Sequence, residues 1–164
     1  MPRSHEALGE EIIQLLPRLR RFARALAGNP HDADDLVQIA IERALARSAQ
    51  LREGAPLSSW MFGILRNAWI DESRGRARRN RLFAPAELGE HVADPTGGQQ
   101  PESLGVQAAV ANLPEEQREV IGLVLVEGLS YREAAEILGV PVGTVTSRLA
   151  RAREALQAKL GNSA

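Results

Sequence analysis

The chain of 164 residues is long enough for one domain or two small ones, and its hydrophobic content of 44% is enough to form a core. It has no cysteine, which excludes a disulfide framework and any thiolate metal site. The formal net charge of −1 is unfavourable for a nucleic-acid binder, so the distribution of charge matters more than its sum.

Membrane and targeting segments are not expected in this sequence. No stretch approaches 18 apolar residues in a row, and the N-terminal sequence MPRSHEALGEE is polar and acidic rather than signal-like. We therefore expect a soluble protein that works in the cytoplasm without membrane insertion.

Two helices are predicted before residue 50. Residues 10–27 place apolar side chains on one face, and the sequence Gly28-Asn29-Pro30 ends this helix. A second helix is predicted over residues 32–49, with acidic residues in its first turn, where the helix dipole favours them. Outside its apolar face, this helix has a surface of carboxylate and amide side chains that contains Asp34, Asp35 and Gln38.

A third helix is predicted over residues 60–79, after the turn formed by Gly54-Ala55-Pro56. Its core stripe is expected to contain Trp60, Ile64, Leu65 and Ala68. The helix becomes strongly basic at its far end, within a patch that runs from Arg66 to Arg81. A second basic patch runs from Arg148 to Lys159, so the two patches indicate two contacts with one extended polyanion.

The segment 82–105 is predicted to be a flexible linker between two domains. Its C-terminal half, ADPTGGQQPESLG (residues 93–105), is rich in Gly, Pro, Gln and Ser and lacks periodic apolar residues. A long surface loop within one domain is the alternative, although unstructured loops of this length are uncommon inside compact domains.

The sequence from residue 130 to 159 is typical of a helix-turn-helix. Ser130 can cap a first helix and form a capping box with Glu133, and Gly139 followed by Pro141 can end that helix. The second helix has an apolar stripe that contains Val145, Leu149, Ala152 and Leu156. Off this stripe, hydroxyl and guanidinium side chains lie near the end of the helix that enters a major groove in this motif. A helical hairpin with a solvated basic face is the alternative.

No alternation typical of strands is present, so the predicted fold is all-α, with two small helical domains joined by a linker. Taken in chain order, the predicted helices and the linker resemble those of an extracytoplasmic-function sigma factor, the smallest class of the sigma-70 family. The resemblance is carried by DADDLVQ in the second helix, ILRNAWID in the third and GTVTSRLARAR in the last. It covers residues 11–79 and 112–160 and looks closest to the kind that drives the general stress response of alphaproteobacteria.

The resemblance implies a division of function between the domains. Residues 1–81 would be sigma region 2, which binds the promoter −10 element and core RNA polymerase. Residues 106–164 would be sigma region 4, which binds the −35 element of promoter DNA through its helix-turn-helix. The chain would direct promoter-specific transcription initiation in a stress or envelope response, under the control of an anti-sigma factor.

The resemblance also assigns roles to individual residues. The −10 contacts would be Asn67, Asp71, Arg74, Arg76, Arg78 and Arg79. The −35 contacts would be Thr144, Ser147, Arg148 and Arg151. The polymerase contacts would be Asp34, Asp35, Leu36 and Gln38. A pocket for unpaired −10 bases is expected in a loop near Gly75 to Leu82, and Thr146 stands where relatives frequently have a basic residue.

The sequence has no group of residues typical of a catalytic site. The three histidines are scattered, without a second metal ligand at helical spacing, and no phosphate-binding glycine loop is present. We therefore expect no enzymatic activity, no cofactor and no metal site. Three other functions remain open: a stand-alone helix-turn-helix regulator, a sigma-like mimic that sequesters an anti-sigma factor, and an RNA-binding adaptor. Such mimics carry a receiver domain and a degraded recognition helix, whereas this sequence keeps GTVTSR.

Regulation by masking is the last expectation. An anti-sigma factor would clamp the two domains together, with an amphipathic helix that buries apolar rims near Leu36 and Val120. The core of the C-terminal domain is expected to be closed by Val120, Ile121, Val124 and Leu125. With a flexible linker, the free chain is expected to be extended and its complex compact.

Overall fold

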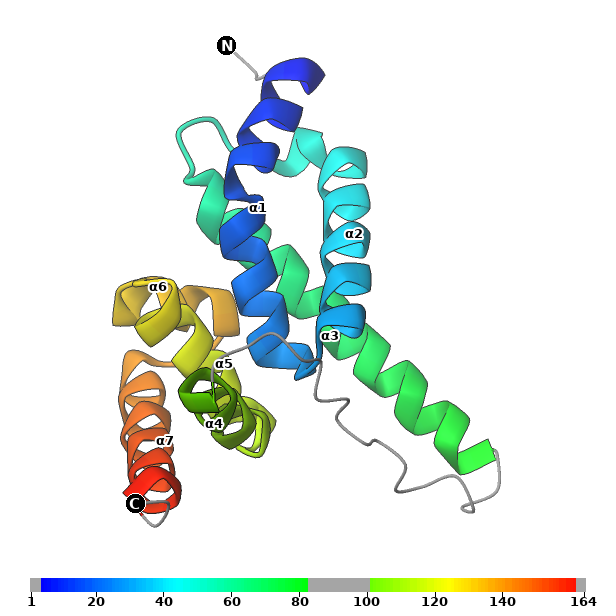
Figure 1. Cartoon of the computed structure of the whole chain (residues 1–164). Coiled ribbons are helices and arrows are strands. Elements are labelled where there is room, and N and C mark those ends of the chain that lie inside the picture. The colour runs from blue at the N-terminus through cyan, green and yellow to red at the C-terminus, as the bar shows by residue number, and fades with distance from the viewer. Residues whose placement is uncertain (1–3, 83–100, 162–164) are drawn as a thin grey trace.

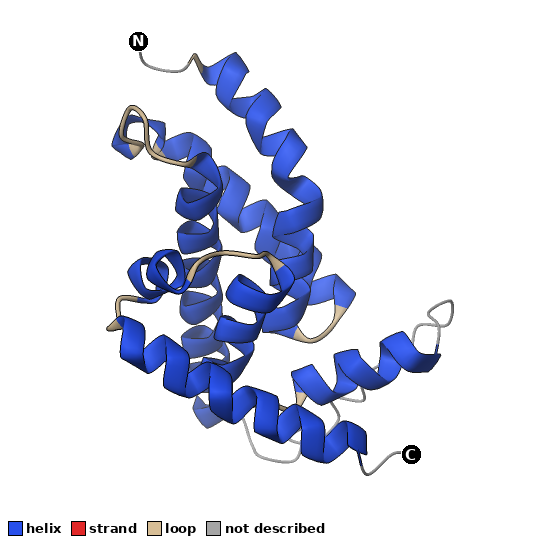
Figure 2. Cartoon of the chain, turned by 90° about the vertical axis from the view of Figure 1, so that its left-hand side faces the viewer, coloured by secondary structure: helices blue, strands red, loops and turns tan. Residues whose placement is uncertain are grey.

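The computed structural model describes residues 4–82 and 101–161 of the chain. The regular elements in these two ranges are all helical, and no strand occurs among them, as Figure 2 shows. This confirms the predicted all-α class. Residues 4–82 are called the N-terminal unit below, and residues 101–161 the C-terminal unit.

Three long helices make up most of the N-terminal unit. They are α1 (His5–Ala27), α2 (Pro30–Ala46) and α3 (Leu57–Leu82), with a short 3-10 turn, η1 (Ser48–Gln50), after α2. Ser4 caps α1 by accepting a hydrogen bond from the Ala7 N–H, and Gly28 ends the helix at a φ of 81°. Asn29 then caps α2 directly, which keeps the connection between α1 and α2 very short.

The core of the N-terminal unit is formed where the three helices meet. Phe22 of α1 and Phe62 of α3 are both fully buried, and their rings pack edge to face with centroids 5.5 Å apart. Trp69 is also buried, while Trp60 is only partly buried. The C-terminal part of α3 continues past the other two helices and projects from the bundle (Figure 1).

The C-terminal unit contains shorter helices. They are α4 (Pro101–Ala111), α5 (Glu115–Val120), a π-helical segment η3 (Ile121–Val126), α6 (Tyr131–Leu138) and α7 (Val142–Gly161). Ser130 and Glu133 form the predicted capping box at the start of α6. Gly139 ends α6 at a φ of 67°, so the helix-turn-helix forms where the sequence predicts it.

The structure differs from the sequence predictions in the extent of two helices and in the packing of the C-terminal core. Helix α3 extends to Leu82, so the segment near Gly75 is helical rather than the expected loop. Helix α4 begins at Pro101, so the last residues of the predicted linker are helical, and residues 83–100 lie outside the described ranges. The π-helical turn shifts the register of the C-terminal core, which buries Leu123 fully and leaves Leu125 46% exposed.

The two units are packed against each other, and the surface where they meet is called the seam below. Helix α1 contacts α4, α5 and η3, and α6 contacts α3, so one continuous core includes residues of both units. At the closest approach, a Cβ on Gly122 of η3 would lie 2.7 Å from Phe22 Cδ1. The chain is therefore closed in this structure, whereas the sequence analysis expected an extended free chain (Figure 1).

Candidate nucleic-acid interface

Helix α7 presents a polar edge to solvent on a firmly packed hairpin. Its apolar stripe enters the core, where Val145, Leu149 and Ala152 are buried. On the other side Ser147 is exposed, and its hydroxyl donates a hydrogen bond to the Gly143 carbonyl oxygen at 3.0 Å. The lone pairs of this hydroxyl still face outward, where they can accept hydrogen bonds from a ligand.

The structure separates the four predicted −35 contacts into two groups. Arg151 and Ser147 are exposed, so both can reach a groove of DNA. Arg148 and Thr144 are half-buried. The Arg148 side chain is 20% exposed, and its Nε lies 3.8 Å from a carboxylate oxygen of Glu116, so it also holds α7 against α5.

Helix α3 carries the predicted −10 contacts, and two of them are held in ion pairs within the N-terminal unit. Asp71 accepts a hydrogen bond from Arg43 of α2 at 2.9 Å. Arg76 pairs with Asp32, at 3.0 Å, in the first turn of α2. Partial burial would raise the pKa of Asp32, but hydrogen bonds from Asn29 and Arg76 outweigh it, so the pKa lies below its ordinary value.

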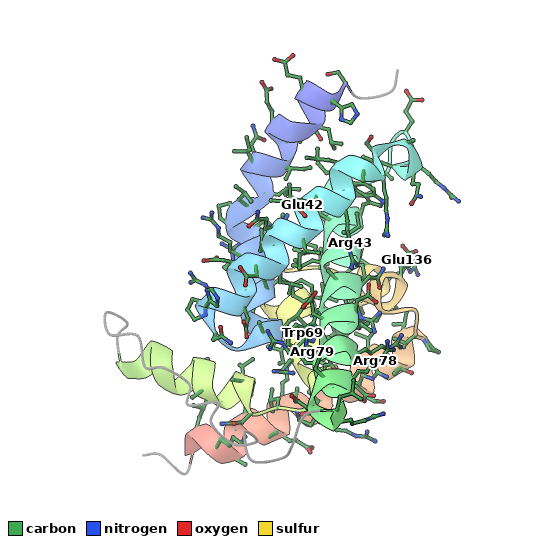
Figure 3. The ribbon with its side chains drawn as sticks, turned by 90° about the vertical axis from the view of Figure 1, so that its right-hand side faces the viewer. Glu42, Arg43, Trp69, Arg78, Arg79 and Glu136 are labelled. Carbon is green, nitrogen blue, oxygen red and sulfur yellow. The ribbon has the colours of Figure 1, made fainter. Side chains whose placement is uncertain are left out.

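The remaining predicted −10 contacts are exposed. Asn67 lies exposed midway along α3, and Arg74, Arg78 and Arg79 follow on the projecting part of the helix. Figure 3 labels Arg78 and Arg79 among the side chains of the chain. These arginines form a cationic extension that suits the phosphates of a nucleic-acid strand.

A groove next to Asn67 was missed by the sequence analysis. It encloses about 440 Å³, and its walls come from the connection between α2 and α3, from α3 and from α6. The walls include Arg47, Gln50, Ser59, Trp60, Asn67, Glu136 and Ile137. The base pocket was expected near Gly75 to Leu82, at the C-terminal end of α3, but the hollow lies along the N-terminal half of this helix. An aromatic residue, Trp60, close to the polar residues of the preceding loop was the available sequence signal.

Helix α2 exposes three of the four residues predicted to contact the polymerase. Asp34, Asp35 and Gln38 are exposed on one side of the helix. Leu36 is the exception, because only 2% of it is exposed and it packs in the core. Leu36 is therefore a core residue that holds α2 in the bundle, and not a contact for a partner. Because it is buried, it also cannot form the apolar rim that was expected to bind a helix of an anti-sigma factor. Val120 is fully buried as well.

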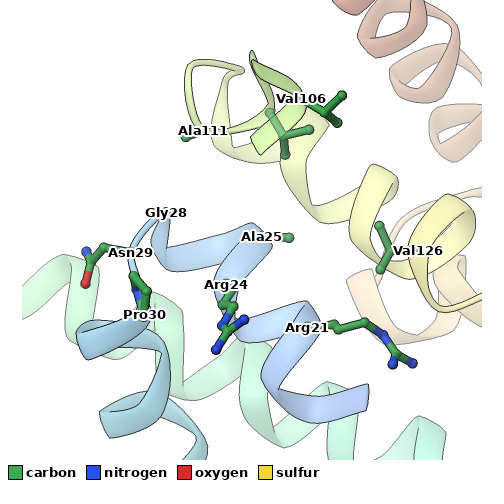
Figure 4. A pocket seen from close by; sticks show the side chains of 10 residues that line it. Arg21, Arg24, Ala25, Gly28, Asn29, Pro30, Val106, Ala111 and Val126 are labelled. Carbon is green, nitrogen blue, oxygen red and sulfur yellow. The ribbon is translucent and has the colours of Figure 1, made fainter. Parts of the chain in front are cut away.

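A second hollow lies at the seam, between the C-terminal end of α1 and helix α4. It encloses about 270 Å³ and is lined mainly by small apolar residues, among them Ala25, Val106, Val110 and Val126. Arg21 and Arg24 of α1 stand along one side of it, as Figure 4 shows. Val106 and Val126 are 47% and 45% exposed, so this is an apolar groove with a cationic edge.

Comparison with known proteins gives a separate match for each part of the chain. A family model of sigma-70 region 4 matches residues 103–156, and a model of the sigma2 domain of PhyR matches residues 12–66. The ECF RNA polymerase sigma factor EcfG of Rhodopseudomonas palustris is 39% identical over 94% of this chain and 86% of its own length. The chain belongs to the extracytoplasmic-function sigma factors.

Solved structures of sigma factors in complexes also resemble this one. The sigma factor RpoE from Bartonella quintana, in complex with the anti-sigma factor NepR, has a TM-score of 0.83 and 33% identity, covering 93% of this chain and 96% of that one. CnrH in complex with the cytosolic domain of CnrY has a TM-score of 0.73 and 28% identity, covering 98% and 92% of the two chains.

None of the helices within residues 4–82 and 101–161 is long and apolar enough to span a bilayer. In the same ranges, no group of three or more His, Asp or Glu side chains is arranged to hold a metal ion.

Proposed function

We propose that this sigma factor recruits core RNA polymerase to promoters by binding the −35 element with α7 and the −10 element with α3. Residues 106–164 would form region 4 and residues 1–81 region 2. The exposed edge of α7, supported by a capped helix-turn-helix, carries this proposal. The nucleotide chemistry belongs to the polymerase, so the chain itself acts in the cytoplasm as a binding protein and not as an enzyme.

At the −35 element, Arg151 and Ser147 are the residues proposed to read base edges. Their exposure and their position on the first three turns of α7 suit insertion into a major groove. Arg148 is proposed to act mainly at the backbone, because its guanidinium is already close to Glu116. Thr144 is half-buried next to it and is assigned a supporting contact.

At the −10 element, the groove next to Asn67 is proposed to receive an unpaired base. Trp60 offers an aromatic face, and Asn67 and Gln50 offer amide groups that can pair with a base edge. Extruding a base costs a few kcal/mol, which such a site would offset. The exposed arginines that follow on α3 would then hold the phosphates of the same strand.

The exposed side of α2 is proposed to bind the polymerase. Asp34, Asp35 and Gln38 project from it, and an acidic surface suits a basic helical partner. This surface is separate from both proposed DNA contacts along the chain, as a factor that joins polymerase to promoter requires.

Control by an anti-sigma factor is proposed to use the apolar groove at the seam. An amphipathic helix would fit it, with apolar residues against Val106 and Val126 and acidic residues towards Arg21 and Arg24. The similarity to EcfG and to RpoE bound by NepR supports a regulator of this kind and a role in the general stress response.

A second candidate function is a sigma-like mimic that sequesters an anti-sigma factor. One observation favours it: the family model that matches residues 12–66 is the sigma2 domain of PhyR. The exposed Arg151 and Ser147 favour a DNA-binding sigma factor instead, because a protein that only sequesters a regulator does not need them.

Run-off transcription and band shifts with purified core polymerase distinguish these functions. A sigma factor gives promoter-specific transcripts and shifts promoter DNA only together with core, whereas a mimic gives neither. Arg151→Ala should weaken −35 binding by about 1–3 kcal/mol if it reads a base. Arg153→Ala is the matched control, because it removes an exposed arginine roughly 200° away around the same helix. Equal losses in both variants would count against base reading by Arg151.

A further inference from the structure

We propose that helix α2 positions the −10 reading face of α3 through two ion pairs, in which Arg43 orients Asp71 and Asp32 holds Arg76 on the far side of the helix. Arg43 and Asp32 are then positioning residues, and Arg76 is not a contact for DNA. This inference rests on the proposed function of α3 and goes beyond it, because it divides residues that the family resemblance treats as one set of contacts.

Helix α3 has one face suited to a nucleic-acid strand and another that turns back towards the bundle. An α-helix turns by about 100° per residue, so Arg74 and Arg78 lie within roughly 20° of Asn67 around the axis. Arg81 is also exposed and lies roughly 40° from Asn67, which extends this face to the end of the helix. Arg76 lies roughly 180° from Asn67, so it faces away from a strand that follows Asn67 along α3.

Helix α2 explains the position of Arg76. Arg76 Nη2 lies 3.0 Å from Oδ1 of Asp32, and the two side chains are 38% and 22% exposed. The Asn29 side-chain amide donates a hydrogen bond to the other carboxylate oxygen of Asp32 at 2.8 Å. Because Asp32 is fixed in the first turn of α2, the pair connects the projecting part of α3 to the bundle. It thereby holds the turns that carry Arg74 and Arg78.

Arg43 acts differently, because its partner lies on the strand-facing side of α3. Asp71 is one turn after Asn67 and roughly 40° from it, and its side chain is 55% exposed. An uncompensated carboxylate at this position would repel the phosphates of a strand. Arg43 Nη1 donates a hydrogen bond to Asp71 Oδ2 at 2.9 Å, which offsets this charge. The hydrogen bond leaves Oδ1 able to accept one from the amino group of a base.

Both pairs begin on the helix that carries the proposed polymerase surface. Asp32 is in the same turn of α2 as Asp34 and Asp35, which are exposed on that surface. A fixed connection between α2 and α3 therefore sets where the −10 strand lies relative to the polymerase.

The two pairs are expected to matter more for geometry than for stability. Ion pairs that remain partly exposed to solvent contribute little to the stability of a fold. A group that fixes the acceptor for a base acts directly on affinity. Removing Arg43 should therefore weaken −10 binding by a larger factor than it lowers the equilibrium constant for folding, which denaturant unfolding measures.

A double-mutant cycle on the holoenzyme tests the role of Arg43. Holoenzyme formed with purified core polymerase is isolated by gel filtration. Its affinity is measured for a single-stranded oligonucleotide that carries the non-template −10 sequence of a promoter found by run-off transcription. Arg43→Ala and Asp71→Ala should each weaken binding about fivefold, and the double variant should bind no more weakly than the weaker single variant. Losses that multiply to about 25-fold would overturn the coupling.

Base analogues supply a readout that a loss of stability alone would not change. Replacing a cytosine by uracil, or an adenine by hypoxanthine, removes the amino group proposed to donate to Asp71. The unmodified chain should lose affinity about fivefold at one such position, and Arg43→Ala should be insensitive there. Arg43→Lys should recover part of the sensitivity, because lysine can still donate to the carboxylate. Equal sensitivity of Arg43→Ala and the unmodified chain would overturn the orientation of Asp71 by Arg43.

Asp32→Asn tests the second pair, because positioning and simple electrostatics predict opposite results. Removing a negative charge ordinarily strengthens binding to DNA. If Asp32 holds the projecting part of α3, the variant should instead bind the −10 strand about threefold more weakly, with −35 duplex binding unchanged. Glu10→Gln is the matched control, because it removes an exposed carboxylate of α1. Binding by Asp32→Asn as strong as that by Glu10→Gln would overturn the role of Asp32.

Arg76→Ala made in the Asp32→Asn background shows whether Arg76 itself contacts DNA. It should cause no further loss of −10 binding, and a further severalfold loss would overturn the assignment of Arg76. If Arg43→Ala loses its helical circular dichroism, the same comparisons are made with Arg43→Gln, which removes the charge but fills the space. Unmodified holoenzyme that transcribes no promoter would instead overturn the proposed function, and with it this inference.

Discussion

The helix-turn-helix and the seam are stabilised in different ways. Between Ser130 and Gly139 the decisive interactions join residues three to five positions apart, such as the capping box and the carbonyl contacts that end α6. Across the seam, Arg18 and Glu127 are 109 residues apart in sequence, and Trp69 and Glu115 are 46 apart. The first is a locally determined motif, and the second exists only when both units are folded.

This difference has a functional consequence. A DNA-reading hairpin that forms from local interactions keeps its shape whether or not the rest of the chain moves. A seam made of long-range contacts depends instead on how the two units are placed relative to each other. Phe62 and Leu65 of the N-terminal unit, and Leu149 and Ala152 of the C-terminal unit, are buried in the continuous core that the packed units share. The chain therefore combines a locally determined motif with an interface that depends on the fold of the whole chain.

The largest expected effect comes from Gly122→Ala, which disrupts the seam at its closest contact. The added methyl group would lie 2.7 Å from Phe22 Cδ1 and 3.0 Å from Cε1, so the ring or η3 must shift. Overpacking of this kind destabilises by about 1–3 kcal/mol. Denaturant unfolding should show this loss, and scattering should show the units further apart.

Gly9→Ala is the control for this prediction. Gly9 is within helix α1, with no heavy atom within 4 Å of a Cβ added there, so alanine should stabilise the chain by about 0.5–1 kcal/mol. A Gly122→Ala variant as stable as Gly9→Ala would show that the two units do not pack together in solution.

A smaller effect is expected from Ser130→Ala, which acts on the helix-turn-helix alone. It removes the hydrogen bond that the Ser130 hydroxyl accepts from the Glu133 N–H at 3.0 Å. Loss of such a cap costs about 1 kcal/mol. The helical signal of α6 and DNA binding should weaken together, while the radius of gyration stays the same. Ser147→Ala, which removes a hydroxyl inside α7, should change stability by only about 0.5 kcal/mol; a similar loss in both variants would argue against the capping box.

The same contrast explains what the sequence predicts and what it leaves out. Caps and turn residues act through their neighbours, so Ser130, Gly139 and the Gly28 turn could be read directly from the chain. The apolar stripe of α7 could be predicted because its apolar residues recur every three or four positions. The partners of Glu115 and Glu127 could not be predicted, because nothing local indicates which distant side chain an acidic residue meets. The burial of Leu36 and the exposure of Leu125 also depend on packing and on the π-helical register.

The smallest effects concern pH, and they act in opposite directions on the two regions. Burial raises the pKa of Glu119 at the seam above its ordinary value of 4.5, although Arg66 opposes this shift. In the helix-turn-helix, hydrogen bonds with Ser130 lower the pKa of Glu133 below the same value. A raised carboxyl pKa means that the folded state binds more protons than the unfolded state.

The stability contributed by Glu119 is therefore complete below pH 4.5 and is lost as the pH rises through its pKa in the folded chain. The contribution of Glu133 is complete above pH 4.5 and is lost as the pH falls through its lowered pKa. Denaturant unfolding from pH 3 to 8 should show that Glu119→Gln flattens the decline above pH 4.5 while Glu133→Gln leaves it intact. Glu133→Gln should flatten the profile below pH 4.5, since the glutamine cannot titrate. If Glu119→Gln left the slope above pH 4.5 unchanged, Glu119 would be solvated, and the seam would be open in the free chain.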